Sequence, residues 1–92
     1  MATMARRVRV FGRVQGVFFR AFTRELAEAA GVGGWVRNLA DGSVEAAIEG
    51  DEEAVRAVIE GVREGPPASQ VERVDVSDEA PGGLAGGFRI LR

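Results

Sequence analysis

The hydrophobic residues of this chain change their spacing along the sequence, and that change limits the folds open to it. Between residues 7 and 14, valines alternate mainly with arginines, which is the period-two pattern of a strand with one buried face. After a glycine-containing loop, Phe22, Leu26 and Ala29 recur at positions i, i+4 and i+7, and glycines follow, which predicts a helix over residues 21–30. The chain therefore begins with a strand, a loop and a helix.

The rest of the chain alternates between strand and helix again. Asp41-Gly42 lies between two apolar-alternating runs, and Asp-Gly in that setting is a strong signal for a β-hairpin. An apolar stripe at helical spacing follows and ends at a Gly-Pro-Pro break. We therefore expect, in order, strands at 34–39 and 43–50, a helix that Asp51 caps and that runs to about Glu64, and strands at 71–76 and 88–91.

The predicted order β-α-β-β-α-β, with a short terminal strand, has a simple solution in three dimensions. Two right-handed crossovers place both helices on one face of an antiparallel sheet, with the first and third strands adjacent at its centre. We therefore expect an α+β fold, the ferredoxin-like sandwich. On the open face of the sheet, Arg7 and Arg9 should lie near Glu45 and Glu49.

Composition narrows the classes of function. The 92 residues suffice for one domain, 1–92, and 46% hydrophobic with 28% charged residues is typical of a globular chain. The chain has no cysteine and no histidine, so thiolate nucleophiles, imidazole bases and the usual zinc and haem ligands are missing. A net charge of -2 argues against a nucleic-acid partner. Since no apolar run approaches the roughly 20 residues of a membrane span, we expect a cytoplasmic protein with no membrane partner. We also expect no cofactor, no metal ligand set and, by default, a monomer.

The loop between the first strand and the first helix is a candidate phosphate-binding site. A loop centred on Gly16 can turn successive backbone N–H groups inward as a concave nest, and the following helix adds its positive end. Arg20 lies near the first helical turn, where the helix dipole disfavours a cation unless an anion binds there. In the alternative interpretation the loop is an ordinary turn and Arg20 lies along the surface. The candidate phosphate-binding residues are Gln15, Gly16, Val17, Phe18, Phe19 and Arg20.

Asn38 is the second candidate functional residue. Asparagine is depleted in strands, yet Asn38 stands within the apolar run 34–39. In the alternative interpretation it only precedes the turn at Asp41-Gly42, where asparagine is common. Arg37 alternates to the opposite face and is expected to be exposed, and Trp35 is expected to serve packing.

Two separated motifs in this sequence resemble those of the acylphosphatase family. Residues 12–20, GRVQGVFFR, meet the family pattern G-x-V-Q-G-V-x-F-R, and residues 34–45, GWVRNLADGSVE, meet G-W-V-R-N-x-x-D-G-x-V-E. The resemblance implies a small ferredoxin-like enzyme that hydrolyses the carboxyl–phosphate bond of a small acyl phosphate without a metal. It also implies that Arg20 binds the phosphate and that Asn38 positions the attacking water. Leu39 departs from the family, since some members carry threonine there.

Two other functions compete with this hypothesis. Ferredoxin-like sheets also bind RNA, but the expected open face of the first strand lacks the aromatic stacking signature of RNA-recognition domains. Acylphosphatase-like modules also resemble parts of larger maturation proteins that handle carbamoyl phosphate. The absence of zinc-binding cysteines argues against that second alternative. Nothing in the two motifs distinguishes one acyl group from another.

Overall fold

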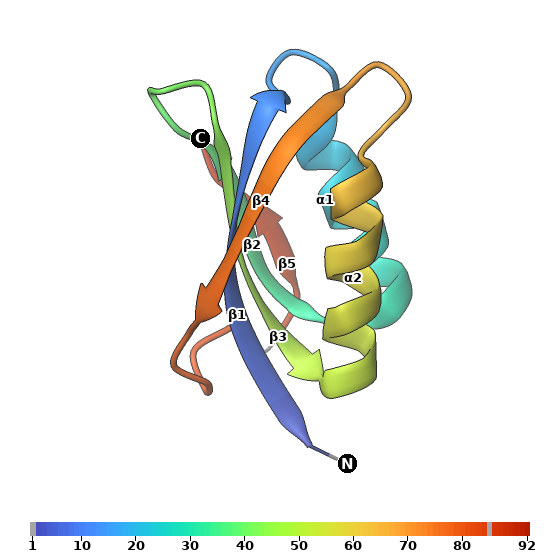
Figure 1. The fold of residues 1–92 in the computed structure, drawn as a ribbon. Coiled ribbons are helices and arrows are strands. Elements are labelled where there is room, and N and C mark those ends of the chain that lie inside the picture. The colour runs from blue at the N-terminus through green and yellow to red at the C-terminus, as the bar shows by residue number, and fades with distance from the viewer. Residues whose placement is uncertain (1, 85) are drawn as a thin grey trace.

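A computed structural model describes residues 2–84 and 86–92, and it has two helices packed on one face of a five-stranded sheet (Figure 1). The predicted order of elements is confirmed. Neither helix within the described residues is long and apolar enough to cross a membrane. The elements are β1 (Thr3–Arg13), α1 (Phe19–Ala30), β2 (Gly33–Asn38), β3 (Val44–Asp51), α2 (Glu52–Glu64), β4 (Gln70–Asp78) and β5 (Phe88–Ile90).

The sheet has the order β4-β1-β3-β2-β5, so β1 and β3 are adjacent at its centre as expected. The first four strands by sequence pair antiparallel throughout. The short β5 instead lies parallel to β2, with Phe88 beside Gly34, and the sheet is therefore mixed. This parallel pairing carries the end of the chain toward the C-terminal end of β2. The last residues consequently lie beside the turn between β2 and β3 (Figure 1).

The core lies between the sheet and the two helices. The expected inward face of β1 is confirmed, because Val8, Val10 and Val14 are all buried. Burial of these aliphatic side chains is the main term that stabilises the fold, at about 25 cal/mol per Å² of apolar surface. In α2 the buried positions Val55, Val58 and Val62 form the expected apolar stripe.

The first helix begins two residues earlier than predicted, and its buried face is rotated. Phe19, Thr23 and Ala27 are the buried residues of α1. Of the expected stripe, Phe22 and Leu26 are half-buried and Leu26 packs against the core, but Ala29 is exposed, so its assignment to the stripe was wrong. Phe19 is the first residue of α1, and its ring enters the core, which turns the i, i+4, i+8 row inward. The early start also places Arg20 within the first turn of the helix.

The second helix lacks the predicted side-chain cap. Asp51 occupies the N-cap position, but its carboxylate accepts no capping hydrogen bond. The N–H of Glu52 instead donates to the carbonyl oxygen of Ala2 at 2.9 Å. The backbone oxygen of the residue before β1 therefore accepts from an N–H group at the start of α2 that a side-chain cap would otherwise satisfy.

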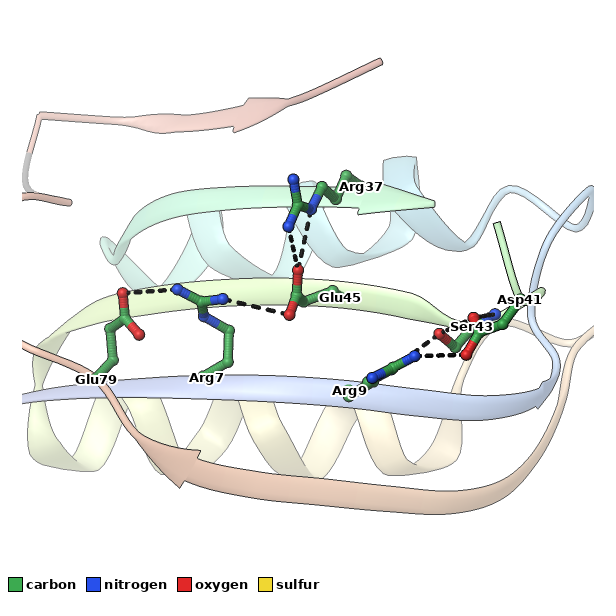
Figure 2. A network of polar contacts seen from close by, with 7 residues as sticks. All are labelled: Arg7, Arg9, Arg37, Asp41, Ser43, Glu45 and Glu79. Carbon is green, nitrogen blue, oxygen red and sulfur yellow. Dashed lines mark hydrogen bonds and ion pairs between the residues drawn. The ribbon is translucent and has the colours of Figure 1, made fainter. Parts of the chain in front are cut away.

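The expected charge pairs on the open face of the sheet are only partly present (Figure 2). Arg7 donates to Glu45 at 3.3 Å, as predicted. Arg9 points along the strand to Asp41 and Ser43, although its backbone neighbour on β3 is Glu45. Glu49 pairs with neither arginine, because its carboxylate accepts the backbone N–H groups of residues 82 and 84 at 2.6 and 3.1 Å.

Candidate active site

Three segments that are far apart in the sequence meet at one end of the sheet (Figure 1). They are the β1–α1 loop, the end of β2 and the C-terminal residues, and they enclose a pocket of about 300 Å³. The pocket brings together both candidate sites of the sequence, the loop with Arg20 and the strand residue Asn38. Its lining residues are Val14, Gly16, Phe18, Phe19, Arg20, Ala21, Asn38, Ile90 and Arg92.

The backbone of the β1–α1 loop has the shape of an anion nest. Gly16 has φ of 74° and Phe18 has φ of 62°, so left-handed residues alternate with others along the loop. Such alternation turns consecutive N–H groups toward one concave side. Among the described residues, no hydrogen-bond acceptor takes the N–H groups of residues 15–19. These donors are free for a ligand, at the positive end of α1.

The side chains of the loop take different directions. Val17 and Phe19 are buried in the core, so only their backbone N–H groups remain available to a ligand. Phe18 is 84% exposed, and its left-handed conformation makes it the only non-glycine residue with positive φ among those described. Left-handed backbone is unfavourable for a bulky side chain, and such strain concentrates at functional sites.

Arg20 projects from the first turn of α1 into the pocket. Its side chain is partly buried, and one guanidinium nitrogen lies 3.5 Å from the carbonyl oxygen of Leu91. Within residues 2–84 and 86–92, no carboxylate forms an ion pair with Arg20. A cation at a helix N-terminus without an anionic partner is an unfavourable arrangement that a bound phosphate would reverse.

The side chain of Gln15 connects the loop to the β2–β3 turn. Its Nε2 donates to the carbonyl oxygen of Leu39 at 2.8 Å and to that of Ser43 at 2.9 Å. These two acceptors flank the turn that follows Asn38. Gln15 therefore fixes the distance between the nest and the hairpin, a role that the sequence analysis did not identify. No local pattern signals it, because the partners are 24 and 28 residues away.

Asn38 is the last residue of β2 and is exposed at the mouth of the pocket. The structure shows no hydrogen bond to its side-chain amide from any residue in the described ranges. Its backbone pairs with Val44 across the hairpin. The amide group is thus positioned by β2 while its oxygen and nitrogen remain available to a ligand or a water molecule.

A polar network holds the turn next to Asn38 (Figure 2). The N–H and the hydroxyl of Ser43 donate to one Asp41 oxygen at 2.9 and 2.5 Å, and Arg9 donates to the other at 2.5 Å. These hydrogen bonds, first those from Ser43 and then that from Arg9, lower the pKa of Asp41 to about 2. The carboxylate is therefore ionised throughout the neutral range and holds the turn in one conformation.

A second network fixes the outer face of β2. Trp35 is half-buried, and the guanidinium groups of Arg7 and Arg37 lie 5.0 Å from its ring centre. Both arginines also donate to Glu45. Burial raises the pKa of Glu45, but the hydrogen bonds from Arg37 and Arg7 outweigh that effect, and the pKa is lowered. Trp35 thus serves packing as expected, and Arg37 is exposed and held by an ion pair.

Two further residues of the pocket were missed by sequence reasoning. Ile90 and Arg92 line it because β5 runs parallel to β2 and the N–H of Leu91 donates to the carbonyl oxygen of Val36 at 2.8 Å. They stand outside the two motifs of residues 12–20 and 34–45, and the pairing of the terminal strand brings them to the pocket. In the described part of the chain, no three acidic side chains lie close enough to hold a metal ion.

The chain was compared with known proteins. The acylphosphatase family model matches residues 6–90. An acylphosphatase of Gloeobacter violaceus is 55% identical over 93 residues, covering 100% of this chain and 99% of that protein. The crystal structure of an acylphosphatase from Bacillus subtilis superimposes with a TM-score of 0.91 at 38% identity, covering 97% of this chain and 99% of that one.

The same fold also occurs inside a larger protein. The crystal structure of T. kodakarensis HypF matches 97% of this chain with a TM-score of 0.85 and 32% identity, but only 12% of the HypF chain is involved. The bacterial acylphosphatases match along nearly their whole length instead. Together with the family match over residues 6–90, these similarities show that the chain belongs to the acylphosphatase family.

Proposed function

We propose that this acylphosphatase hydrolyses acyl phosphates with the loop amides and Arg20 as its phosphate site and Asn38 as the residue that orients the attacking water. The observation that carries the proposal is one pocket lined by the Gly16 loop, Arg20 and Asn38. Within residues 2–84 and 86–92, the loop N–H groups have no acceptor, Arg20 has no ion pair and the Asn38 amide has no hydrogen bond. Phosphoryl transfer requires mainly positioning and neutralisation of the equatorial oxygens. These groups are suited to both tasks.

The chemistry of the leaving group explains why no acid catalyst is needed. The carboxylate released from an acyl phosphate has a conjugate-acid pKa of about 4, so it leaves without protonation. The planar guanidinium of Arg20 matches two phosphate oxygens at once. The N–H groups of residues 15–19 supply further donors from a fixed backbone, which needs no rearrangement as charge develops.

Asn38 cannot serve as a base, because a neutral amide takes no proton at ordinary pH. Its role is to hold the water in line with the bond that breaks. The proton then passes to a phosphate oxygen of the substrate, whose second pKa of about 6 makes it a suitable acceptor. An essential enzyme base near neutrality in the pH–rate profile, with a matching solvent isotope effect, would contradict this step.

The decisive experiment compares three variants on a synthetic aryl acyl phosphate. Arg20→Ala should lower kcat/KM by about 10²- to 10³-fold and raise the inhibition constant of inorganic phosphate, since the main counter-charge is lost. Asn38→Ala should lower kcat and leave phosphate inhibition nearly unchanged, because it contacts the water. Arg24→Ala removes an exposed arginine one turn further along α1 and is the matched control. A fully active Arg20→Ala protein would refute the proposal.

The same mechanism predicts an activity that survives metal chelation. Neutralisation is assigned to Arg20 and the backbone amides, so EDTA should leave the rate unchanged and added Mg²⁺ should not increase it. Loss of activity with EDTA that a divalent cation restores would contradict this part of the proposal. We also propose a monomer as the active form. Light scattering of the active protein tests that assignment.

A further inference from the structure

Phe18 has a position that the fold does not explain. Its ring is 84% exposed at the rim of the phosphate pocket, and it contributes nothing to the hydrophobic core. The aromatic pair of this region joins Phe19 to Phe22, and the cation–π pairs of the described residues involve Phe11 and Trp35 instead.

The backbone does not explain Phe18 either. Its φ of 62° is left-handed, where glycine or asparagine is favoured and a residue with a bulky side chain is strained. A phenylalanine at this position is therefore unfavourable for the loop and unnecessary for packing. Single exposed apolar residues are common on protein surfaces, but this one combines strain with a place at the active-site rim. Its ring is available to a ligand.

The substrate supplies an apolar group that needs such a surface. In an in-line displacement the acyl group leaves on the side of phosphorus opposite the attacking water. If Asn38 orients the water, the acyl group points away from the β2–β3 turn. The accessible apolar side chains of the pocket outside that turn are Phe18, Ala21 and Ile90, which come from the loop, the start of α1 and β5.

We infer that Phe18, together with Ile90 of the same pocket lining, forms the subsite that binds the acyl group, and that it favours aromatic or extended apolar acyl phosphates over acetyl phosphate. This inference rests on the proposed function, since it uses the same phosphate position. The ring face offers an apolar surface against which an aryl or alkyl group packs, whereas the single methyl of an acetyl group reaches little of it. The side chain of Phe18 is thus a specificity-determining group, whereas its backbone N–H belongs to the proposed phosphate site.

The test compares kcat/KM for benzoyl phosphate and acetyl phosphate in several variants. Phe18→Gly and Phe18→Asn both suit left-handed backbone and remove the ring, so each should fold. Each should lower the benzoyl-over-acetyl preference by about three- to tenfold, the range that one aromatic contact supplies. Phe18→Tyr keeps the ring and should retain the preference. Because the proposed nest includes the backbone N–H of Phe18, the readout is the benzoyl-over-acetyl ratio of kcat/KM, which a change in phosphate binding common to both substrates does not alter.

Val76→Ser is the matched control, because it removes the other large exposed hydrophobic residue, which lies on β4 away from the pocket. An unchanged benzoyl-over-acetyl ratio in Phe18→Gly and Phe18→Asn would overturn the inference, as would an equal loss on both substrates. Failure of the wild-type protein to hydrolyse either substrate would instead overturn the proposed function. The two failures are therefore distinguishable.

Discussion

Neighbouring residues of the loop have different tasks, although the sequence presents them as one motif. Phe19 is buried in the core, Gln15 bonds to the hairpin, and Arg20 faces the pocket. Phe18 alone among the loop's large apolar residues faces outward. Of the two phenylalanines, only Phe19 lies in the core. A substitution at each position should therefore change a different measured quantity.

Gln15→Ala tests the connection between the loop and the hairpin. It removes two hydrogen bonds, each worth about 0.5 to 1.5 kcal/mol, so the free energy of unfolding should fall by about 1 to 3 kcal/mol. The turn beside Asn38 is then less firmly positioned, and kcat should fall more than the affinity for inorganic phosphate. Denaturant unfolding and steady-state kinetics measure the two effects. Gln70→Ala, at the exposed start of β4, is the control, and equal behaviour of the two variants would contradict the role of Gln15.

Asp41 gives the turn a defined pH dependence. Because its pKa is lowered to about 2 from an unfolded value of about 3.9, the ionised carboxylate stabilises the folded state above roughly pH 4. That contribution should disappear as the pH falls from about 4 to about 2. The stability difference between wild type and Asp41→Asn should shrink over the same range, with Asp78→Asn as the control for charge. An NMR titration of the Asp41 carboxyl with a midpoint near 4 would contradict this prediction.

At the scale of the elements, the pairing between the end of β1 and β4 affects the direction in which the chain enters the loop. The pairing of β1 with β4 shifts register between Phe11 and Gly12, where Glu72 is an extra residue on β4. An extra residue of this kind increases the local twist of the paired strands, and here it lies beside β1 only two residues before the loop. Sequence reasoning placed Gly12 in a regular strand and started the helix at residue 21. Both errors have one cause, since bulges and left-handed residues interrupt the local period on which such predictions depend.

Alanine substitutions at two glycines near the loop distinguish the effect of backbone strain from that of steric exclusion. A Cβ at Gly12 would lie 2.2 Å from the carbonyl oxygen of Gln70, whereas one at Gly16 would meet no atom within 4 Å. Both residues have positive φ. Gly16→Ala should therefore lose about 1 to 2 kcal/mol of unfolding free energy and weaken phosphate inhibition by disturbing the nest.

Gly12→Ala should lose more stability, about 2 to 5 kcal/mol, because the strain is joined by a clash with the backbone of β4. Chemical denaturation of both variants under the same conditions measures the difference. Equal losses of unfolding free energy for the two alanine variants would contradict the prediction that the backbone of β4 excludes a side chain at position 12. Wild-type phosphate inhibition in a folded Gly16→Ala protein would argue against the nest as the phosphate site.

At the scale of the molecule, the ferredoxin-like arrangement explains why a chain of net charge -2 can present a cationic pocket. Carboxylates neutralise many arginines on the open face of the sheet, as in the pairs of Arg7 with Glu45 and of Arg9 with Asp41. At the pocket, Arg20 and Arg92 lie among backbone donors, and Arg20 has no ion pair within the described ranges. The local charge therefore favours an anion even though the whole chain is acidic.

Sequence patterns were sufficient to predict the features that depend on neighbours within a few residues. Sequence patterns predicted the buried face of β1, the Asp41-Gly42 hairpin, the order of the elements and the loop and strand motifs. They could do so because a strand has a short hydrophobic period and a turn requires particular residues at adjacent positions. Contacts between distant groups follow from the packing of the sheet and helices. Gln15 reaches carbonyls 24 and 28 residues away, and β5 brings Ile90 and Arg92 to the pocket by lying parallel to β2. Contacts between residues far apart in the chain leave no local pattern, since only the packed sheet and helices place them side by side.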